Sequence, residues 1–305
     1  KAWEASKTED TFIRLANAWW DLGDFYKELE DIPAWRWIWE SKMLPLCKTV
    51  WKKYRFSSAY LCVAARYCVA ASYNKLGDIS KAEGNLSSAR KYYELSLDNF
   101  KQFAEKFPTL WNPWILSISY NNLGSIFEIE GDIPVARKHY EFALEIIRKL
   151  ATETPTIEIR WNLSISYERI GDIFKAEGNL QAARKYYELF LEISKQLAEE
   201  APTIAIRRSL SISYERKGDI CEAEGDIRAA RKYYELDLEI CIQLAEETPT
   251  IENRRDLSIS YEKMGDICEA EGDLQAAQKY YELDLEISKQ LKEESQTIET
   301  RRDLS

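Results

Sequence analysis

The sequence predicts an all-α solenoid in which antiparallel helix pairs stack side by side, and three observations predict it. A ten-residue segment recurs along the chain at a fixed spacing. Apolar residues within each copy lie three and four residues apart, which is the period of one helix face. A two-residue break with glycine divides each copy into two such stretches, and the alternating pattern of strands is absent from the sequence.

The repeat period is 47 residues. The segment 164–173 (SISYERIGDI) returns at 211–220 and 258–267, with looser copies at 117–126 and 70–79. The marker glycines keep the same spacing: Gly77, Gly124, Gly171, Gly218 and Gly265. A fixed period of this size is typical of stacked supersecondary units.

Each period predicts two helices of roughly 20 residues. At the break Gly178-Asn179, glycine tolerates the left-handed conformation that ends a helix, and asparagine can cap the next one. We expect each new pair to begin at a step such as Thr154-Pro155, with threonine as the cap and proline in the first helical position.

These residues resemble the tetratricopeptide repeat. One copy supplies the aromatic, Leu-Gly, aromatic, turn-glycine and Ala-aromatic pattern in Tyr120, Leu123, Gly124, Phe127, Gly131, Ala136 and Tyr140. The resemblance implies a right-handed superhelical solenoid whose first helices line a concave groove. The family repeat has about 34 residues, so the longer period here indicates about two extra turns per helix, as in long-helix bacterial arrays. The position of the usual late alanine holds Ser96, Ala143, Phe190, Asp237 and Asp284 in the five repeats, so only one repeat keeps the alanine.

Three parts are predicted. Residues 1–56 form a degenerate helical repeat with an insertion, 57–295 form five regular repeats, and 296–305 are the truncated start of a further repeat.

We expect Pro45 to break a helix within the insertion. Trp35 and Trp39 share a helix face and Trp37 does not, so either the insertion or another domain covers the remaining tryptophan. Because the array stops within a repeat, the natural protein is expected to continue beyond residue 305.

Composition excludes several classes of function. The net charge of -10 disfavours nucleic acid as a partner. No run of about 18 apolar residues predicts a membrane span, and no secretory signal opens the chain. Six scattered cysteines without a C-x-x-C pair indicate buried thiols in the reducing cytoplasm.

An enzyme is not predicted. His139 is the only histidine, which leaves no basis for a triad or a zinc site, and we expect it to be a partly exposed surface residue. The glycine turns do not form a phosphate loop, and the carboxylates follow the repeat period. We therefore expect no cofactor and no metal.

The resemblance places three positions of each first helix in the groove, namely positions 5, 9 and 12 when the marker glycine is position 8. In the last three repeats they hold Lys175 and eight carboxylates: Glu168, Asp172, Glu215, Asp219, Glu222, Glu262, Asp266 and Glu269. The first two repeats supply Asp78 and, from these positions or beside them, the amides Asn74, Asn121 and Asn122, which can pair with a ligand backbone. Such a groove predicts a basic protein or peptide partner. The alternative is an ordinary solvated face, neutralised by Arg169, Arg216, Lys217 and Lys263.

A second ladder lies near the rim of the predicted groove, at Tyr67, Trp114, Trp161, Arg208, Arg255 and Arg302. Tryptophan and arginine dominate binding energy at interfaces. The alternative is that Trp114 and Trp161 pack between neighbouring helices.

Two functions follow. The first is a scaffold that binds a peptide or partner segment in the groove. The second is a regulatory segment of a larger effector, a protease or NTPase, whose catalytic domain lies outside this sequence and adjoins the array. Binding of nucleic acid through Arg208, Arg255 and Arg302 is a third class, which the net charge disfavours.

Overall fold

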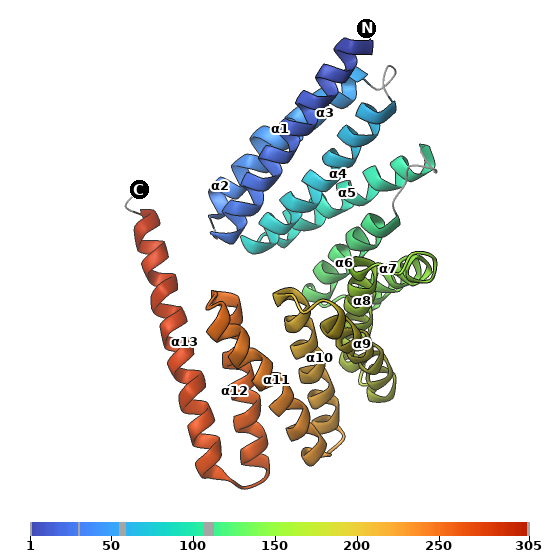
Figure 1. Ribbon diagram of the computed structural model, residues 1–305. Helices are drawn as coiled ribbons and strands as arrows, with labels where there is room; N and C mark the ends of the chain where they lie inside the picture. Colours follow the sequence, from blue (N-terminus) through green and yellow to red (C-terminus); the bar gives the residue numbers. More distant parts are fainter. Residues whose placement is uncertain (1, 30, 55–58, 107–112, 304–305) are drawn as a thin grey trace. The chain divides into compact units, whose positions relative to one another are not determined.

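The computed structural model describes residues 2–29, 31–54, 59–106 and 113–303, with side chains described at 10–27, 29, 31–53, 63–102 and 113–294. Within these ranges the chain is helical and contains no strand (Figure 1). It divides into two compact units, Lys1–Glu153 and Thr154–Ser305. In each unit, consecutive helices pack together in antiparallel pairs, which confirms the predicted all-α solenoid class.

The first unit contains α1 (Ala2–Glu28), α2 (Ile32–Trp37), the π-helical turn η1 (Ile38–Met43), α3 (Leu44–Tyr54), α4 (Ala59–Ala82), α5 (Leu86–Lys106), α6 (Pro113–Ile129) and α7 (Ile133–Glu153). The second contains α8 (Ile157–Ala176), α9 (Leu180–Glu200), α10 (Ile204–Ala223), α11 (Ile227–Glu247), α12 (Ile251–Ala270) and α13 (Leu274–Asp303). The pairs α4–α5, α6–α7, α8–α9, α10–α11 and α12–α13 are the regular repeats.

The two helices of each pair touch where the marker glycine meets a tyrosine of the second helix. A Cβ built on Gly171 would lie 2.5 Å from the ring of Tyr187, which is itself fully buried. A Cβ built on any of the other four marker glycines would lie 2.4–2.6 Å from the ring of the corresponding tyrosine. No larger residue fits at this contact, which explains why glycine recurs inside a helix that it otherwise destabilises.

The turns within the pairs are as predicted. Their glycines have φ between +75° and +84°, which is the left-handed region. The Asn179 side chain accepts a hydrogen bond from the backbone N–H of Ala182 at 3.1 Å and so caps α9.

The predicted start of each pair is wrong by two residues. The cap of α8 is Thr156, whose hydroxyl accepts from the N–H of Ile159 at 3.3 Å, and Pro155 lies outside the helix. Because a proline disfavours the helical conformation of the residue before it, Thr154 stays outside as well. Thr203 and Thr250 cap α10 and α12 in the same way.

Pro45 does not break the helix, contrary to the sequence prediction. It lies in the first turn of α3, directly after the π-helical turn η1. A proline cannot donate the usual backbone hydrogen bond, and the wider π turn before it accommodates the missing bond while the helix continues.

The tryptophans of the first unit divide as their spacing predicts. Trp35 and Trp39 are buried in a core with Phe12 and Met43. Trp37 is 47% exposed, and the Lys42 ammonium lies 4.5 Å from the centre of its ring.

The C-terminal segment differs from the prediction of a new repeat at 296–305. Residues 296–303 continue α13 without a turn, and residues 304–305 lie outside the described part. Gln296 stands where the earlier repeats have Pro155, Pro202 and Pro249, so nothing in the backbone ends the helix there.

Successive pairs are joined by a recurring ion pair. In the second unit, an arginine early in α9 and another early in α11 reach a glutamate directly after the next first helix, as Arg184–Glu224 and Arg231–Glu271. The pairs Arg36–Glu83 and Arg90–Glu130 repeat it in the first unit. Each pair is partly exposed and contributes less than about 1 kcal/mol, so it marks the register more than it stabilises the stack.

We expect Gly171→Ala to destabilise the protein, because the new methyl group overlaps a buried ring. Overpacking costs about 1–3 kcal/mol, against a gain of up to about 1 kcal/mol from alanine in a helix. Gly178→Asn is the matched control, since nothing lies within 4 Å of Gly178 and asparagine tolerates its positive φ. Urea unfolding followed by circular dichroism measures both. Equal midpoints for Gly171→Ala and wild type would contradict the contact.

Candidate interaction groove

Arg216 of α10 is the centre of the predicted groove face in the second unit. Its guanidinium lies 3.2 Å from Asp172 and 3.6 Å from Glu168, both on α8, and 3.0 Å from its neighbour Glu215. Three predicted groove carboxylates therefore share one cation. These contacts bring α8 and α10 together along this face, and they match the alternative in which Arg216 neutralises the carboxylates.

Asp219 is held even more firmly. Its carboxylate is buried and forms ion pairs with Lys175 of α8 at 2.6 Å and with Lys263 of α12 at 3.0 Å. It also accepts a hydrogen bond from the hydroxyl of Tyr234 at 2.8 Å. Burial raises its pKa, but the hydrogen bonds and charges of the two lysines outweigh this, so the pKa of Asp219 lies below its ordinary value. Asp219 thus stays ionised and links three successive first helices.

Glu215 is the carboxylate most perturbed by burial on this face. Burial raises its pKa to about 7, although the charge of Arg216 acts in the opposite direction. It is therefore poised to change its charge near neutral pH, which the sequence alone did not indicate.

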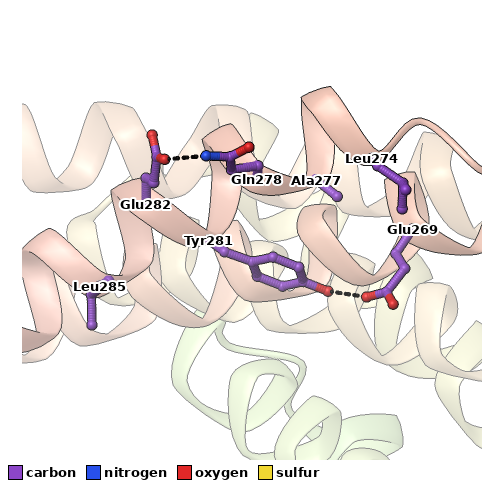
Figure 2. A pocket seen from close by; sticks show the side chains of 7 residues that line it. All are labelled: Glu269, Leu274, Ala277, Gln278, Tyr281, Glu282 and Leu285. Atoms are coloured by element: carbon purple, nitrogen blue, oxygen red, sulfur yellow. Dashed lines mark hydrogen bonds between the residues drawn. The ribbon is translucent and has the colours of Figure 1, made fainter.

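The carboxylates of α12 are different, because they are open to solvent. Glu262, Asp266 and Glu269 are all exposed, and no ion pair is recorded for them among the described residues. The hydroxyl of Tyr281 lies 2.8 Å from Asp266 and 3.0 Å from Glu269, so its single proton can be donated to either carboxylate, which orients them without neutralising them. Figure 2 shows Tyr281 directed toward Glu269. Glu222 on α10 is half-buried and is oriented in the same way by Tyr234 at 2.8 Å.

The groove residues of the first unit are largely engaged within the fold. Asp78 accepts a hydrogen bond from the hydroxyl of Tyr93 at 2.7 Å, and burial raises its pKa. The Asn74 amide lies 3.4 Å from the hydroxyl of Ser119. Asn121 and Asn122 are half-buried on α6.

The rim residues divide into engaged and open ones. Trp114 packs against the cluster of Ala70, Phe100 and Ile115, as its alternative interpretation requires. Arg208 binds Glu252 and Asp256 of α12, the latter at 3.2 Å, and so joins two repeats. Trp161 is half-buried with its indole nitrogen in the interior, and Arg255 is exposed. The side chain of Arg302 lies outside the described residues.

Sequence reasoning missed the tyrosine hydroxyls that position the predicted groove carboxylates. Tyr187 donates to Asp172 at 2.7 Å, as Tyr234 does to Asp219. The available signal was the Gly-Asp step, since the glycine that admits the ring directly precedes the carboxylate that its hydroxyl reaches.

Other sites are not evident in the described part of the chain. No group of histidine, cysteine and acidic residues there is arranged to hold a metal ion. None of its helices combines the length and apolarity needed to cross a bilayer. His139 is half-buried and stacks on Phe127, with ring centres 5.2 Å apart, and the five described cysteines are free thiols.

Comparison with known proteins identifies the repeat type. A tetratricopeptide repeat model matches residues 70–102, 165–197 and 212–241, and a second matches 260–295. No curated sequence matches the chain. BtubC (BKLC) from P. vanneervenii has a similar structure, with a TM-score of 0.61 and 20% identity over 83% of this chain and 92% of that chain. The nearly identical TPR-like repeats of a kinesin light chain from P. anserina give a TM-score of 0.45 and 19% identity over 72% and 94%. At these identities the similarity to BtubC shows the fold.

We expect Glu215→Gln to flatten the dependence of stability on pH. The pKa of Glu215 is about 7 in the folded state and near 4.5 in the unfolded state, so the folded state binds the proton more tightly. Ionisation of Glu215 therefore lowers the free energy of unfolding as pH rises from 4.5 to about 7. The full effect is at most roughly 3 kcal/mol. Urea midpoints across this range measure it. Burial also raises the pKa of other carboxylates, such as Asp237. They are present in both proteins, so their contributions cancel in the difference between wild type and variant. A wild-type-minus-variant difference that does not change with pH would contradict the assignment.

Proposed function

The chain belongs to the tetratricopeptide repeat family, and from this premise we propose that it is a non-catalytic scaffold that holds a basic segment of a partner protein along its first-helix face. The family and the similar fold support a protein-interaction scaffold. The free thiols of the described cysteines support a cytoplasmic location.

The observation that carries the proposal is the unbalanced charge at α12. On α8 and α10, Lys175, Arg216 and Lys263 compensate most of the groove carboxylates. On α12, Glu262, Asp266 and Glu269 are exposed and uncompensated within the described structure. A cationic side chain laid along this face therefore gains attraction at α12 first, at little desolvation cost.

The buried network gives this surface its rigidity. Because Asp219 is fixed by two lysines and a tyrosine, α10 and α12 keep their register when a partner binds. A preorganised surface loses less conformational entropy on binding. The partner therefore contacts the exposed carboxylates of α12 and the half-buried Glu222 of α10, while the buried pairs support them from behind.

We expect Glu262→Arg to weaken binding of Lys- and Arg-rich peptides by about tenfold or more at low salt, since it replaces attraction with repulsion. Glu239→Arg is the matched control, because it makes the same charge change at an exposed site on α11, a second helix. Fluorescence polarisation with a peptide series graded in basic content, at two ionic strengths, measures the effect. If both variants weaken binding equally, net charge rather than the groove is responsible and the proposal is wrong.

A further inference from the structure

A hollow in the first unit is lined by side chains of α5, α6 and α7. Its volume is about 240 Å³, below the roughly 300–1,000 Å³ of sites for drug-sized molecules, so it suits a small chemical group. Its apolar lining residues are Leu97, Leu123 and Phe127, and Glu94 and His139 are among the polar ones. We call it the α5–α7 hollow.

The second unit shows the same arrangement two repeats later, on α9, α10 and α11. Glu188 stands at the position of Glu94, and Lys217 stands at the position of Leu123. The Lys217 ammonium lies 2.9 Å from Glu188, although Lys217 is only 3% exposed. A lysine side chain therefore occupies, in the second unit, the place beside the glutamate that is hollow in the first.

An aromatic ring lies beside this place in both units. The Lys217 ammonium is 5.9 Å from the centre of the Tyr233 ring, within the range of a cation–π contact. His139 stands at the position of Tyr233 and stacks on Phe127, with ring centres 5.2 Å apart. Burial and the charge of Lys101 lower the pKa of His139, so its ring is uncharged at neutral pH and does not repel a cation.

The charges around the hollow are compatible with an additional cation. Lys101 lines the hollow, and Lys195 stands at the same position in the second unit. Because Lys195 is present there together with the buried Lys217, a lysine at this position does not prevent a second ammonium from entering. The leucine of the first unit removes one positive charge, while the carboxylates of Glu94 and Asp98 remain in the lining.

Glu94 can exchange its present partner for such a cation. It pairs with Arg90, one turn earlier on α5, at 3.1 Å, and both side chains are about half exposed. Exposed pairs of this spacing contribute little to stability, so breaking one is not costly. Arg90 also lies 3.5 Å from Glu130 and keeps that partner when Glu94 turns to the hollow.

We propose that the α5–α7 hollow binds a primary ammonium group on an alkyl chain, in the place that the Lys217 side chain fills in the second unit. The ammonium donates to Glu94 and lies beside the His139 ring, while the alkyl chain packs on the apolar lining residues. A free alkylamine and a lysine side chain of a partner share this chemistry, and both are charged at neutral pH. The lining residues are not residues of the predicted groove, so this is a second site.

His139 makes the site directly observable, because it is the only histidine of the chain. In the full chain labelled at histidine, every imidazole nitrogen signal in the magnetic resonance spectrum belongs to this residue. We expect pentylamine to shift these signals saturably. Pentanol and pentanoate have the same alkyl chain without the positive charge, and they should leave the signals unchanged at equal concentration.

The pKa of His139 reports the sign of the bound charge. A bound ammonium should lower this pKa further, since a like charge disfavours the imidazolium, whereas a bound anion would raise it. The charged groups that face the ring are the same with and without the ligand; they are Lys101, Arg90 and Glu94 of α5 and Lys138 of α7.

Glu94→Gln should weaken pentylamine binding about tenfold, because it removes the charge and keeps the shape of the side chain. Glu235→Gln is the matched control, since Glu235 stands three repeats later, on α11, and forms the same one-turn pair with Arg231. Leu123→Lys should abolish binding, because it supplies the ammonium from within the chain. Circular dichroism melting curves establish that each variant is folded, and if Leu123→Lys is not, the two glutamine variants decide.

Two further measurements identify the source of the ammonium and separate this site from the groove. Acetyl-lysine amide presents the same ammonium on a peptide-like group. Binding as tight as that of pentylamine identifies a partner's lysine, and its exclusion while pentylamine binds identifies a free amine. Glu262→Arg should leave pentylamine binding unchanged, so that failure of the groove proposal and failure of this one are distinguishable.

Four results would overturn the proposal. The first is no saturable shift of the His139 signals with pentylamine. The second is an equal response to pentanol or pentanoate, or a rise in the pKa of His139 on binding. The third is an equal loss of affinity in Glu94→Gln and Glu235→Gln. The fourth is undiminished binding to a folded Leu123→Lys variant.

Discussion

The contact between a helix glycine and a tyrosine ring is the constraint on which the rest of this structure depends. It sets how closely the two helices of a pair approach, since a Cβ at Gly218 would lie 2.4 Å from the ring of Tyr234. The same ring carries a hydroxyl that reaches Asp219, the residue after the glycine. The packing of the pair and the orientation of a first-helix carboxylate are therefore consequences of one contact.

The second level of organisation is electrostatic. Most of the first-helix carboxylates of α8 and α10 are compensated by cations, and several of these cations come from a neighbouring repeat, as with Asp172 and Arg216. Burying such charges is costly unless their partners are well placed, and removing one partner leaves an unpaired charge inside the stack. The network therefore favours one register of neighbouring helices. It also has a boundary at α12, where Glu262, Asp266 and Glu269 have exposed carboxylates.

Much of the fold could be predicted from the sequence because the repeat carries its own signals. The glycine turns, the helix lengths and the faces of Trp35 and Trp39 are local properties, and the structure agrees with them. The errors are also local in origin. A π turn accommodates Pro45, and the absence of a proline at Gln296 lets α13 continue.

The site was less accessible to prediction, because its chemistry depends on pairing between repeats. Helical phase can place Asp219 and Glu262 on the same face, but it cannot show that one is bound by two lysines while the other is exposed. The raised pKa of Glu215 is likewise a product of burial that no single helix reveals. Charge counts along the sequence therefore overstated the acidity of α8 and α10.

The recurring junction also bears on how such a chain can change in length. Junctions in the second unit are made by partners at set separations along the sequence, about one period for Asp219 with Lys263 and about half a period for Asp237 with Ser260. Duplication or loss of one whole period brings equivalent positions of the helices together again, whereas a shorter insertion rotates the following helix and separates the partners. The architecture thus tolerates insertion or deletion of whole repeats and is disrupted by insertions of other lengths.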